Sequence, residues 1–341
     1  MNNFLKIRSG AINLVADTLQ SNKISGKILY VSDSVVDGLY GQTVKNQIKT
    51  VGILKEEKVD NNTISYAMSV AERAIATDIE CIVAMGGGKV LDVCKYAAFI
   101  AKIPILSIPT TIANDGIASP IAVLKRQDFK PKSLGCAVPT MVLLDVNVVL
   151  SGPLEHIKAG IGDTISNYMA LMDWEYAASC GKDKMNGYAF LMSQSALDAL
   201  INTNYNEICP EFIEVLANSM IMSGIAMDFA GSSRPVSGSE HLFSHALDYY
   251  AKTQNLHGIQ VALGTVATLK IIGRDYSKVG SYLKKFDVGI SPKAMGIDKE
   301  MFVYCFKQAA QMRKNRYTYL DDCDLSTQTL ERVYNEINEE F

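Results

Sequence analysis

The sequence predicts an α/β domain over residues 1–150 and an all-helical domain over residues 151–341. Two observations give this fold class. The first 150 residues alternate short β-rich runs with helical patterns, which is typical of a doubly wound, mostly parallel sheet. After Ser151-Gly152-Pro153, the segments carry helical periodicity, with Gly and Pro between them. A cleft between two such halves is the natural place for an active site.

The elements of the first domain follow one another in strand and helix alternation. Strands are expected at residues 26–33, 50–54, 79–86, 103–111 and 139–146, and helices at 35–50, 63–77 and 89–101. In the second domain, helical patterns cover 156–179, 183–204, 210–230 and the histidine-rich segment 231–258. Because ligands of open parallel sheets bind at the carboxyl ends of the strands, those ends are the expected nucleotide site.

Composition narrows the class of protein. The 341 residues suffice for roughly two domains of about 150 residues each, and 48% of them are hydrophobic. A net charge of −3 gives no reason to expect a nucleic-acid partner. The seven cysteines are scattered and form no C-x-x-C pair, as expected of reduced thiols. No apolar run has the length of a signal peptide or a membrane span, so we expect a cytoplasmic protein with no membrane partner.

Three of the four histidines, His241, His245 and His257, lie within residues 231–258. Ser237 to Glu240 reads S-x-x-E, a capping box, which predicts a helix start there and places His241 and His245 on one helix face. His257 precedes Gly258 at a turn or a helix start. Three converging imidazoles indicate a metal site, whereas isolated core or surface histidines are the alternative.

A carboxylate is available to complete this site. The segment Ala159-Gly160-Ile161-Gly162-Asp163-Thr164 places Asp163 at or near a helix start, where it acts either as a cap or as a ligand. With His241 and His257 it would make a three-ligand site with an open position, as catalytic zinc requires. Iron or nickel would also bind such ligands. His245 is then placed to orient a substrate or relay a proton, or it is an inert neighbour.

Glycine residues mark the expected phosphate site of the first domain. Gly86-Gly87-Gly88 precedes a helix, so backbone N–H groups there can approach a pyrophosphate, although a tight turn alone would also explain the run. The spacing is neither that of a Walker loop nor of a Rossmann fingerprint. Asp33 ends the first strand, where it either binds ribose hydroxyls or caps a helix.

Two further polar segments are candidates for ligand contacts. Ser107–Pro120 gathers hydroxyls, Asp115 and Gly116 at a strand's carboxyl end, although a turn would account for half of them. Ser232–Ser239 offers the Arg234 guanidinium, several hydroxyls and a helix start, which suit a substrate phosphate. A loop with an arginine salt bridge is the alternative for this second segment.

Four motifs taken together resemble a known family: GGGKVLD, PTTIANDGIAS, AGIGDTISNYMALMDWE, and SRPVSGSEHLFSHALD with LHG. They are similar to those of the sn-glycerol-1-phosphate dehydrogenases, within the superfamily of metal-dependent alcohol dehydrogenases, glycerol dehydrogenases and dehydroquinate synthases. The resemblance covers roughly residues 25 to 270, and the last motif is the most specific. It implies reversible reduction of dihydroxyacetone phosphate to sn-glycerol 1-phosphate with NADH or NADPH and zinc, a step of phospholipid biosynthesis.

The resemblance also implies roles for individual residues. The NAD(P) pyrophosphate would lie at Gly88, Lys89, Val90, Leu91 and Asp92, to which the glycine run itself adds Gly86 and Gly87. The nicotinamide side would contact Thr110, Thr111, Ile112, Ala113 and Ser119. Substrate contacts would come from Asp115, Asp163 and His245, to which the residues themselves add Arg234 and Ser237. The metal would bind to Asp163, His241 and His257.

Other functions remain open from the sequence. A glycerol dehydrogenase-like polyol oxidoreductase or a dehydroquinate synthase-like lyase would share the metal and cofactor frame, but the lyase branch usually carries Glu where Asp163 stands. A metal-binding regulatory module is a third possibility, opposed by the presence of every ligand type at once. Asp33 favours NAD(H) over NADP(H), because a ribose 2′-phosphate beside it would meet like charge. Exposed helix faces in the second half favour a homo-oligomer, and residues 271–341 carry no recognisable motif.

Overall fold

The computed structural model describes residues 5–128, 130–251 and 255–341, which fall into two compact units. The first unit contains the chain up to Leu154 together with Cys209–Asp228, and the second contains Glu155–Ile208 and Phe229–Phe341. The first division lies four residues beyond the predicted boundary at 150, but the segment 209–228, expected in the second domain, groups with the first. A Cβ at Gly224 would lie only 2.6 Å from the carbonyl oxygen of Ala118, so this helix lies directly against the backbone of the first unit.

A six-stranded sheet forms the centre of the first unit, with strand order β1-β8-β5-β4-β2-β3. All of its pairings are parallel. The strands are β1 (Leu5–Arg8), β2 (Lys27–Ser32), β3 (Ile53–Lys58), β4 (Ile79–Gly86), β5 (Ile105–Pro109) and β8 (Met141–Asp145). The predicted parallel α/β class is therefore confirmed for this unit.

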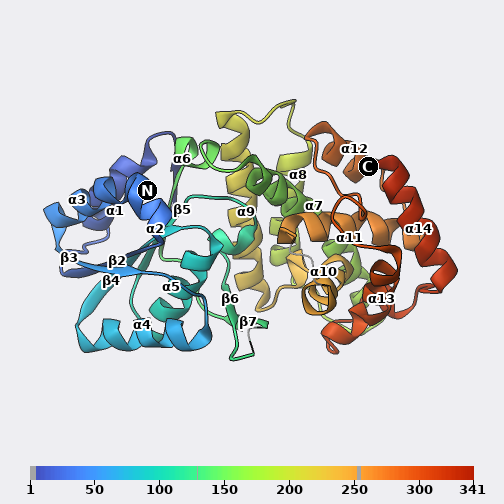
Figure 1. The fold of residues 1–341 in the computed structure, drawn as a ribbon, viewed down its shortest axis with the longest axis horizontal. Helices are drawn as coiled ribbons and strands as arrows, with labels where there is room; N and C mark the ends of the chain where they lie inside the picture. Colours follow the sequence, from blue (N-terminus) through green and yellow to red (C-terminus); the bar gives the residue numbers. More distant parts are fainter. Residues whose placement is uncertain (1–4, 129, 252–254) are drawn as a thin grey trace. The chain divides into compact units, whose positions relative to one another are not determined.

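Helices cover both faces of the sheet (Figure 1). On one face, α1 (Val15–Ser21) and α3 (Gln42–Val51) pack on alternate residues of β4, namely Cys81, Val83 and Met85. On the other face lie α4 (Ile64–Ala76) and α5 (Gly88–Ala101), which contact each other, and α5 also contacts β4. A central parallel strand buried on both faces reads as a continuous apolar run, which is why IECIVAMG was recognisable from sequence.

Several elements of the first unit differ from the prediction. Strand β3 lies at Ile53–Lys58 instead of 50–54, because α3 continues to Val51 and the residues of this edge strand are mostly exposed. The predicted helix at 35–50 is divided into α2 (Ser34–Val36), a π-helical turn η2 (Asp37–Gly41) and α3. Unpredicted are β1, the short helix α6 (Val146–Leu150), and the antiparallel hairpin of β6 (Ile121–Lys125) and β7 (Pro131–Gly135).

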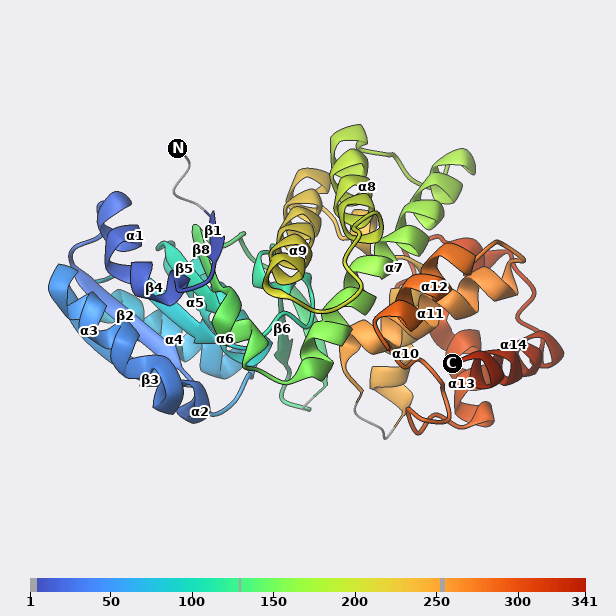
Figure 2. The same ribbon diagram turned by 90° about the horizontal axis from the view of Figure 1, so that it is seen from above.

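The described part of the second unit consists of helices and loops, as expected. Its long helices are α7 (Leu154–Ser179), α8 (Gly187–Ile201), α10 (Ser239–Tyr250), α11 (His257–Ile271), α12 (Ser277–Lys285), α13 (Lys299–Ala309) and α14 (Thr327–Glu340). Helix α10 packs against α11 and α13 (Figure 2). The rings of Phe243 and Phe306 stack between α10 and α13 with centroids 4.1 Å apart.

Among the described residues, helix α9 (Pro210–Ala230) is the one helix that is long and apolar enough to cross a membrane. Within the structure, 61% of its apolar window is buried. Burial of this kind is also what the core helix of a protein in water shows.

Candidate metal and cofactor sites

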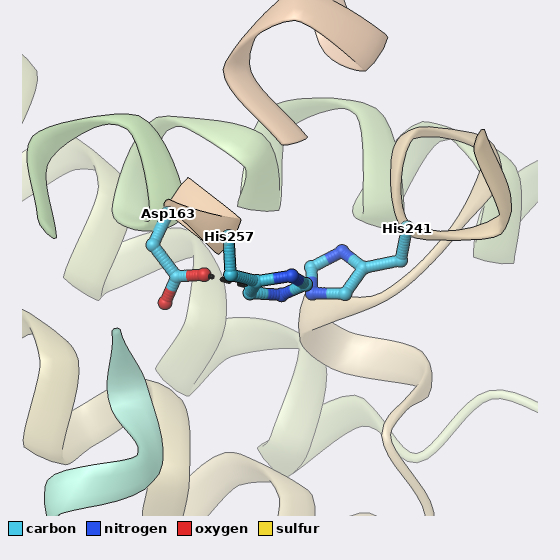
Figure 3. A group of neighbouring side chains, drawn as sticks. All are labelled: Asp163, His241 and His257. Carbon is cyan, nitrogen blue, oxygen red and sulfur yellow. Dashed lines mark ion pairs between the residues drawn. The ribbon is translucent and has the colours of Figure 1, made fainter. Parts of the chain in front are cut away.

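Helices α7, α10 and α11 bring Asp163, His241 and His257 together in the second unit (Figure 3). Their ligand atoms all lie within 4.8 Å of one another. Nε2 of His257 is 3.8 Å from Oδ1 of Asp163, and the rings of His241 and His257 have centroids 4.9 Å apart. Two imidazoles and one carboxylate make a donor set suited to a zinc or iron ion.

Two glycines allow α7 and α11 to approach closely enough for this cluster. A Cβ at Gly258 would lie 1.8 Å from the carbonyl oxygen of Ala159, and one at Gly162 would lie 2.3 Å from the carbonyl oxygen of Gly258. Any side chain at either position would hold the two backbones apart. Because Asp163 and His257 are the immediate chain neighbours of these glycines, the close crossing places both ligands at one point.

Asp163 occupies a different place from the one predicted. It lies at the tenth residue of α7, well inside a helix that begins at Leu154, and not at or near a helix start. Its side chain is 5% exposed. Capping therefore does not explain this aspartate, whose carboxylate instead points toward His257 (Figure 3).

The helix that carries His241 also begins differently. Helix α10 starts at Ser239 with Gly238 as its N-cap, and no side chain of Ser237 caps it, so the predicted capping box is wrong. Asp173 of α7 takes that role, since its carboxylate accepts from the Ser239 amide at 2.6 Å and from the Ser239 hydroxyl at 3.0 Å. The carbonyl oxygen of Ser237 accepts from Arg316.

Hydrogen bonds fix the orientation of both candidate histidine ligands. Nδ1 of His241 lies 2.8 Å from the fully buried Glu240 carboxylate. Nδ1 of His257 lies 3.1 Å from the Ser244 hydroxyl, which itself donates to Oε1 of Gln260 at 2.6 Å and so accepts the imidazole proton. With Nδ1 protonated in both rings, each Nε2 carries the lone pair that binds a metal ion.

The electrostatics keep these imidazoles neutral. Burial lowers the pKa of His241 to about 3, assisted by the charges of Arg313 and Arg316. Burial likewise lowers the pKa of His257 to about 4, with His241 contributing next. Neutral imidazoles need release no proton before they bind a cation. Beside them, burial raises the pKa of the Glu240 carboxyl to about 7.

His245 follows His241 by one turn of α10 and lies near the same cluster. Its ring centroid is 6.2 Å from that of His241 and 6.5 Å from that of His257. Among the described residues, its buried Nε2 has no hydrogen-bond partner. Burial, followed by the charge of Arg313, lowers its pKa well below the usual range. A buried, neutral and unsatisfied ring nitrogen beside a donor set is placed to bind a ligand.

Arg234 and Ser237, the predicted phosphate contacts, are largely engaged with the protein. The Nε of Arg234 pairs with Asp183, and its Nη1 donates to the Tyr317 carbonyl at 2.7 Å. This is the salt-bridged loop that the sequence left open as the alternative. Ser237 is buried at 4% exposure.

Two arginines that sequence reasoning missed lie beside the same loop. Arg313 and Arg316 follow the end of α13, in the segment that carried no recognisable motif. Each donates to the Ser233 hydroxyl at 2.9 Å. The only signal in the sequence was a cluster of basic residues, RKNR, which a solvated surface loop would equally show.

In the first unit, the glycine run forms an open helix N-terminus. Strand β4 ends at Gly86, Gly87 is the N-cap and α5 begins at Gly88. The amides of Val90 and Leu91 donate to the Gly87 carbonyl at 3.0 and 3.1 Å, so the exposed N–H groups of the helix start belong to Gly88 and Lys89. Since nothing lies within 4 Å of a Cβ position at Gly88, an anion can approach these amides.

Other predicted cofactor residues surround this turn. Oδ2 of Asp33 lies 3.4 Å from a Cβ position at Gly86, while its Oδ1 caps α2 through the amides of Val35 and Val36. The Thr110 amide donates to the Gly86 carbonyl at 3.1 Å. Three adjacent strands, β2, β4 and β5, thus bring Asp33, the glycine run and Thr110 to one edge of the sheet.

The other residues predicted to contact the cofactor are buried, or their side chains lie against other groups of the protein. The side chains of Val90, Leu91 and Ile112 are buried in the core, so only their backbones could face a cofactor. Nζ of Lys89 donates to the Asp60 carbonyl at 2.6 Å, and the buried Ser119 hydroxyl donates to the Ile121 carbonyl at 3.3 Å. Thr111 Oγ1 is 3.3 Å from a Cβ position at Gly87. Ala113 is partly buried.

Asp92 and Asp115 share a buried lysine. Nζ of Lys95 lies 3.0 Å from Asp92 and donates to the carbonyls of Gly116 and Ile121 at 2.7 and 2.5 Å. Burial raises the pKa of Asp115 to about 6, against the opposing charge of Lys95. Asp115 begins the short helix η3 (Asp115–Ile117).

Comparison of the sequence with known proteins finds related dehydrogenases. Residues 6–153 match the model of the family described as iron-containing alcohol dehydrogenase. Glycerol-1-phosphate dehydrogenase [NAD(P)+] of Hyperthermus butylicus is 32% identical, over 96% of this chain and 94% of that protein. The enzyme of the same name from Methanosphaera stadtmanae is 35% identical over 83% of each chain.

Solved structures share the fold. The structure of a probable glycerol dehydrogenase from Sinorhizobium meliloti is similar, with a TM-score of 0.78 and 17% identity over 99% of this chain and 96% of that chain. Sulfoacetaldehyde reductase from Bifidobacterium kashiwanohense, solved with NAD+, has a TM-score of 0.73 and 15% identity, covering 99% and 98% of the two chains. At such identities the similarity concerns the fold alone.

Proposed function

We propose that this chain, which belongs to the glycerol-1-phosphate dehydrogenase family, catalyses the reversible NAD(P)H-linked reduction of dihydroxyacetone phosphate to sn-glycerol 1-phosphate. The observation that carries the proposal is the convergence of Asp163, His241 and His257, with both imidazoles oriented and neutral. A ketone accepts hydride readily only when the charge developing on its oxygen is stabilised, and this donor set supports that function.

Zinc is the metal we propose for the cluster, although iron and nickel suit the same donors. When bound, a divalent cation supplies a Lewis acid for the carbonyl oxygen. The protein contributes the position of the donors. Glu240 and Ser244 hold the two rings with Nε2 available, and the glycine crossing of α7 and α11 sets the distance between Asp163 and His257.

His245 is proposed to hold the substrate. Its unsatisfied, buried Nε2 can hydrogen-bond to a substrate hydroxyl, which would orient the carbonyl and provide a path for the proton that completes the reduction. Asp115, whose pKa burial raises to about 6, is also proposed to contact the substrate, as the resemblance implies.

The dinucleotide is proposed to bind at the sheet edge of the first unit. The amides of Gly88 and Lys89 would bind the pyrophosphate, and Asp33 would accept hydrogen bonds from the adenosine ribose. Thr110–Ala113 and Ser119 would contact the nicotinamide side. A carboxylate beside the ribose supports NADH as the preferred cofactor, with NADPH as the weaker one.

The decisive experiment supplies zinc-loaded protein with NADH and follows nicotinamide absorbance on adding dihydroxyacetone phosphate. Dihydroxyacetone and glycerol serve as unphosphorylated controls, and the reverse reaction is run with the 1- and 3-phosphates of sn-glycerol. We expect turnover of dihydroxyacetone phosphate and of sn-glycerol 1-phosphate. Equal efficiency with glycerol would instead assign the chain to polyol oxidation, and no nicotinamide turnover with any of them would refute the proposal.

A cytoplasmic location and a homo-oligomeric state are further parts of the proposal. Their support comes from the seven unpaired cysteines, as expected in a reducing compartment, and from the exposed apolar side chains of the helical half, such as Tyr188 and Leu191. Light scattering of the purified chain measures the oligomeric state directly.

A further inference from the structure

We infer that Arg313 and Arg316, together with Ser233, form the binding site for the phosphate group of the substrate. This inference rests on the proposed function and extends it to a segment outside the family motifs. Both guanidinium groups donate to one atom, the Ser233 hydroxyl oxygen, each at 2.9 Å. A neutral hydroxyl cannot balance two positive charges, so the arrangement lacks an anion that would bind between them.

The nearby carboxylates are already paired with other groups. Asp183 forms an ion pair with Arg234, and Glu240 accepts from His241 and from the Gly238 amide. Three guanidinium groups therefore share this region with two carboxylates. Burial and then the charges of Arg313 and Arg234 lower the pKa of Arg316 to about 9, against the opposing charges of Glu240 and Asp183. A bound dianion would relieve the repulsion.

The two arginines are not equivalent. Arg316 is buried, and its Nη1 is also bound to the Ser237 carbonyl beside the start of α10, so it supports the loop as well as the charge. Arg313 is only partly buried, and its one hydrogen-bond partner among the described residues is Ser233. The Nε and Nη2 groups of Arg313 are therefore donors that a phosphate can accept from, in the forked geometry that suits its oxygens.

The position of this pair matches the requirements of the reaction. The turn η5 (Ala310–Met312), which directly precedes Arg313, contacts α10, the helix that carries His241 and His245. Arg316 binds the Ser237 carbonyl two residues before α10 begins, so a phosphate held by this pair would lie beside that helix. Binding energy from this non-reacting end of the substrate can then position the carbonyl for reduction.

The test replaces Arg313 in the full, zinc-loaded chain. For Arg313→Ala we expect kcat/KM for dihydroxyacetone phosphate to fall about 30-fold, the range of a lost charge-assisted hydrogen bond, with dihydroxyacetone changed less than about twofold. Free guanidinium ion should restore part of the loss. Lys314→Ala is the matched control, because it removes an exposed positive charge from the neighbouring position and should leave both substrates unaffected.

Arg313→Gln, which retains a donor for Ser233 but not the charge, guards against a purely structural effect and should show the same selective loss. Metal content and thermal unfolding confirm that each variant has assembled its site. Equal losses on both substrates in correctly metallated variants, or no loss on the phosphate ester, would overturn the inference while leaving the proposed function intact.

A wild type that turns over no dihydroxyacetone phosphate would refute the proposed function instead. In that case calorimetry with inorganic phosphate decides the present inference. Binding to the wild type that weakens at least tenfold in Arg313→Ala supports the site. Equal affinity in the two proteins, or no binding to either, rejects it.

Discussion

Gly258→Ala tests how the metal donors are brought together. An added Cβ would lie 1.8 Å from the Ala159 carbonyl oxygen, whereas ordinary contact requires at least 3.4 Å, so α7 and α11 must separate by about 1.6 Å. The obstructing atom is backbone and cannot rotate away. Asp163 and His257 are adjacent to this contact and would move apart with the two helices.

This separation can be compared with the largest distance between two donor atoms that bind the same metal ion. Two donors that each lie about 2.1 Å from zinc can be no more than about 4.2 Å apart. Oδ1 of Asp163 and Nε2 of His257 are now 3.8 Å apart, within that limit, and the ligand atoms of the whole cluster lie within 4.8 Å of one another. An increase of about 1.6 Å between Asp163 and His257 would put this pair beyond the limit, so one ligand would be lost and zinc affinity should fall by at least about 100-fold.

The assay measures zinc per chain after dialysis against a weak chelator, together with thermal unfolding of the metal-free protein. We expect substoichiometric zinc and a folding cost on the order of 1–3 kcal/mol from overpacking. Gly187→Ala is the control, because Gly187 begins α8 with open space around its Cβ position and should retain full zinc and stability. Full zinc occupancy with an unchanged melting temperature in Gly258→Ala would refute the close-crossing argument.

Three further predictions concern the ligands and the cofactor. Because His257 and His241 have pKa values lowered to about 4 and 3, both rings stay neutral as pH falls until it approaches those values. From pH 7 to 5.5, zinc affinity measured by chelator competition should therefore fall much less than the roughly 70-fold loss that two imidazoles of ordinary pKa would give, and the change that remains should come from Glu240, whose pKa is raised to about 7. His241→Ala and His257→Ala should each abolish stoichiometric zinc by elemental analysis, and full occupancy in both would disprove the ligand assignment. Asp33→Ser, which can still cap α2, should raise the ratio of kcat/KM for NADPH to that for NADH about tenfold, or about 1.4 kcal/mol; a wild type that already prefers NADPH tenfold would show that Asp33 does not face the ribose.

Local patterns in the sequence were enough to predict most of the sheet and to single out Asp163, His241 and His257, which the structure brings together. Buried parallel strands such as β4 are continuous apolar runs, and the spacing of His241 and His245 alone indicates one helix face. The edge strand β3 was misplaced because its exposed, charged residues carry no such signal. The sequence therefore predicts the type of an element where its residues are fully buried, but not where they are exposed to solvent.

Features that depend on distant parts of the chain could not be predicted. The start of α10 is set by Asp173, 66 residues before Ser239, which overrode the local capping-box pattern. The contacts of Arg313 and Arg316 with Ser233 join residues about 80 positions apart. A pattern within a short window contains no information about such partners, because they become neighbours only when the helices pack.

The grouping of Cys209–Asp228 with the first unit has a consequence during synthesis. The chain leaves that unit after Leu154, builds Glu155–Ile208, and only then returns with α9 to cover the backbone at Ala118 through Gly224. Domains generally fold as units as they emerge from the ribosome. Here the first unit remains incomplete until α9 has been synthesised, and α9 is long and strongly apolar. A nascent chain arrested before residue 228 should therefore expose an apolar surface to which chaperones bind. A fragment that ends at residue 150 should aggregate, whereas a fragment that also contains α9 should not.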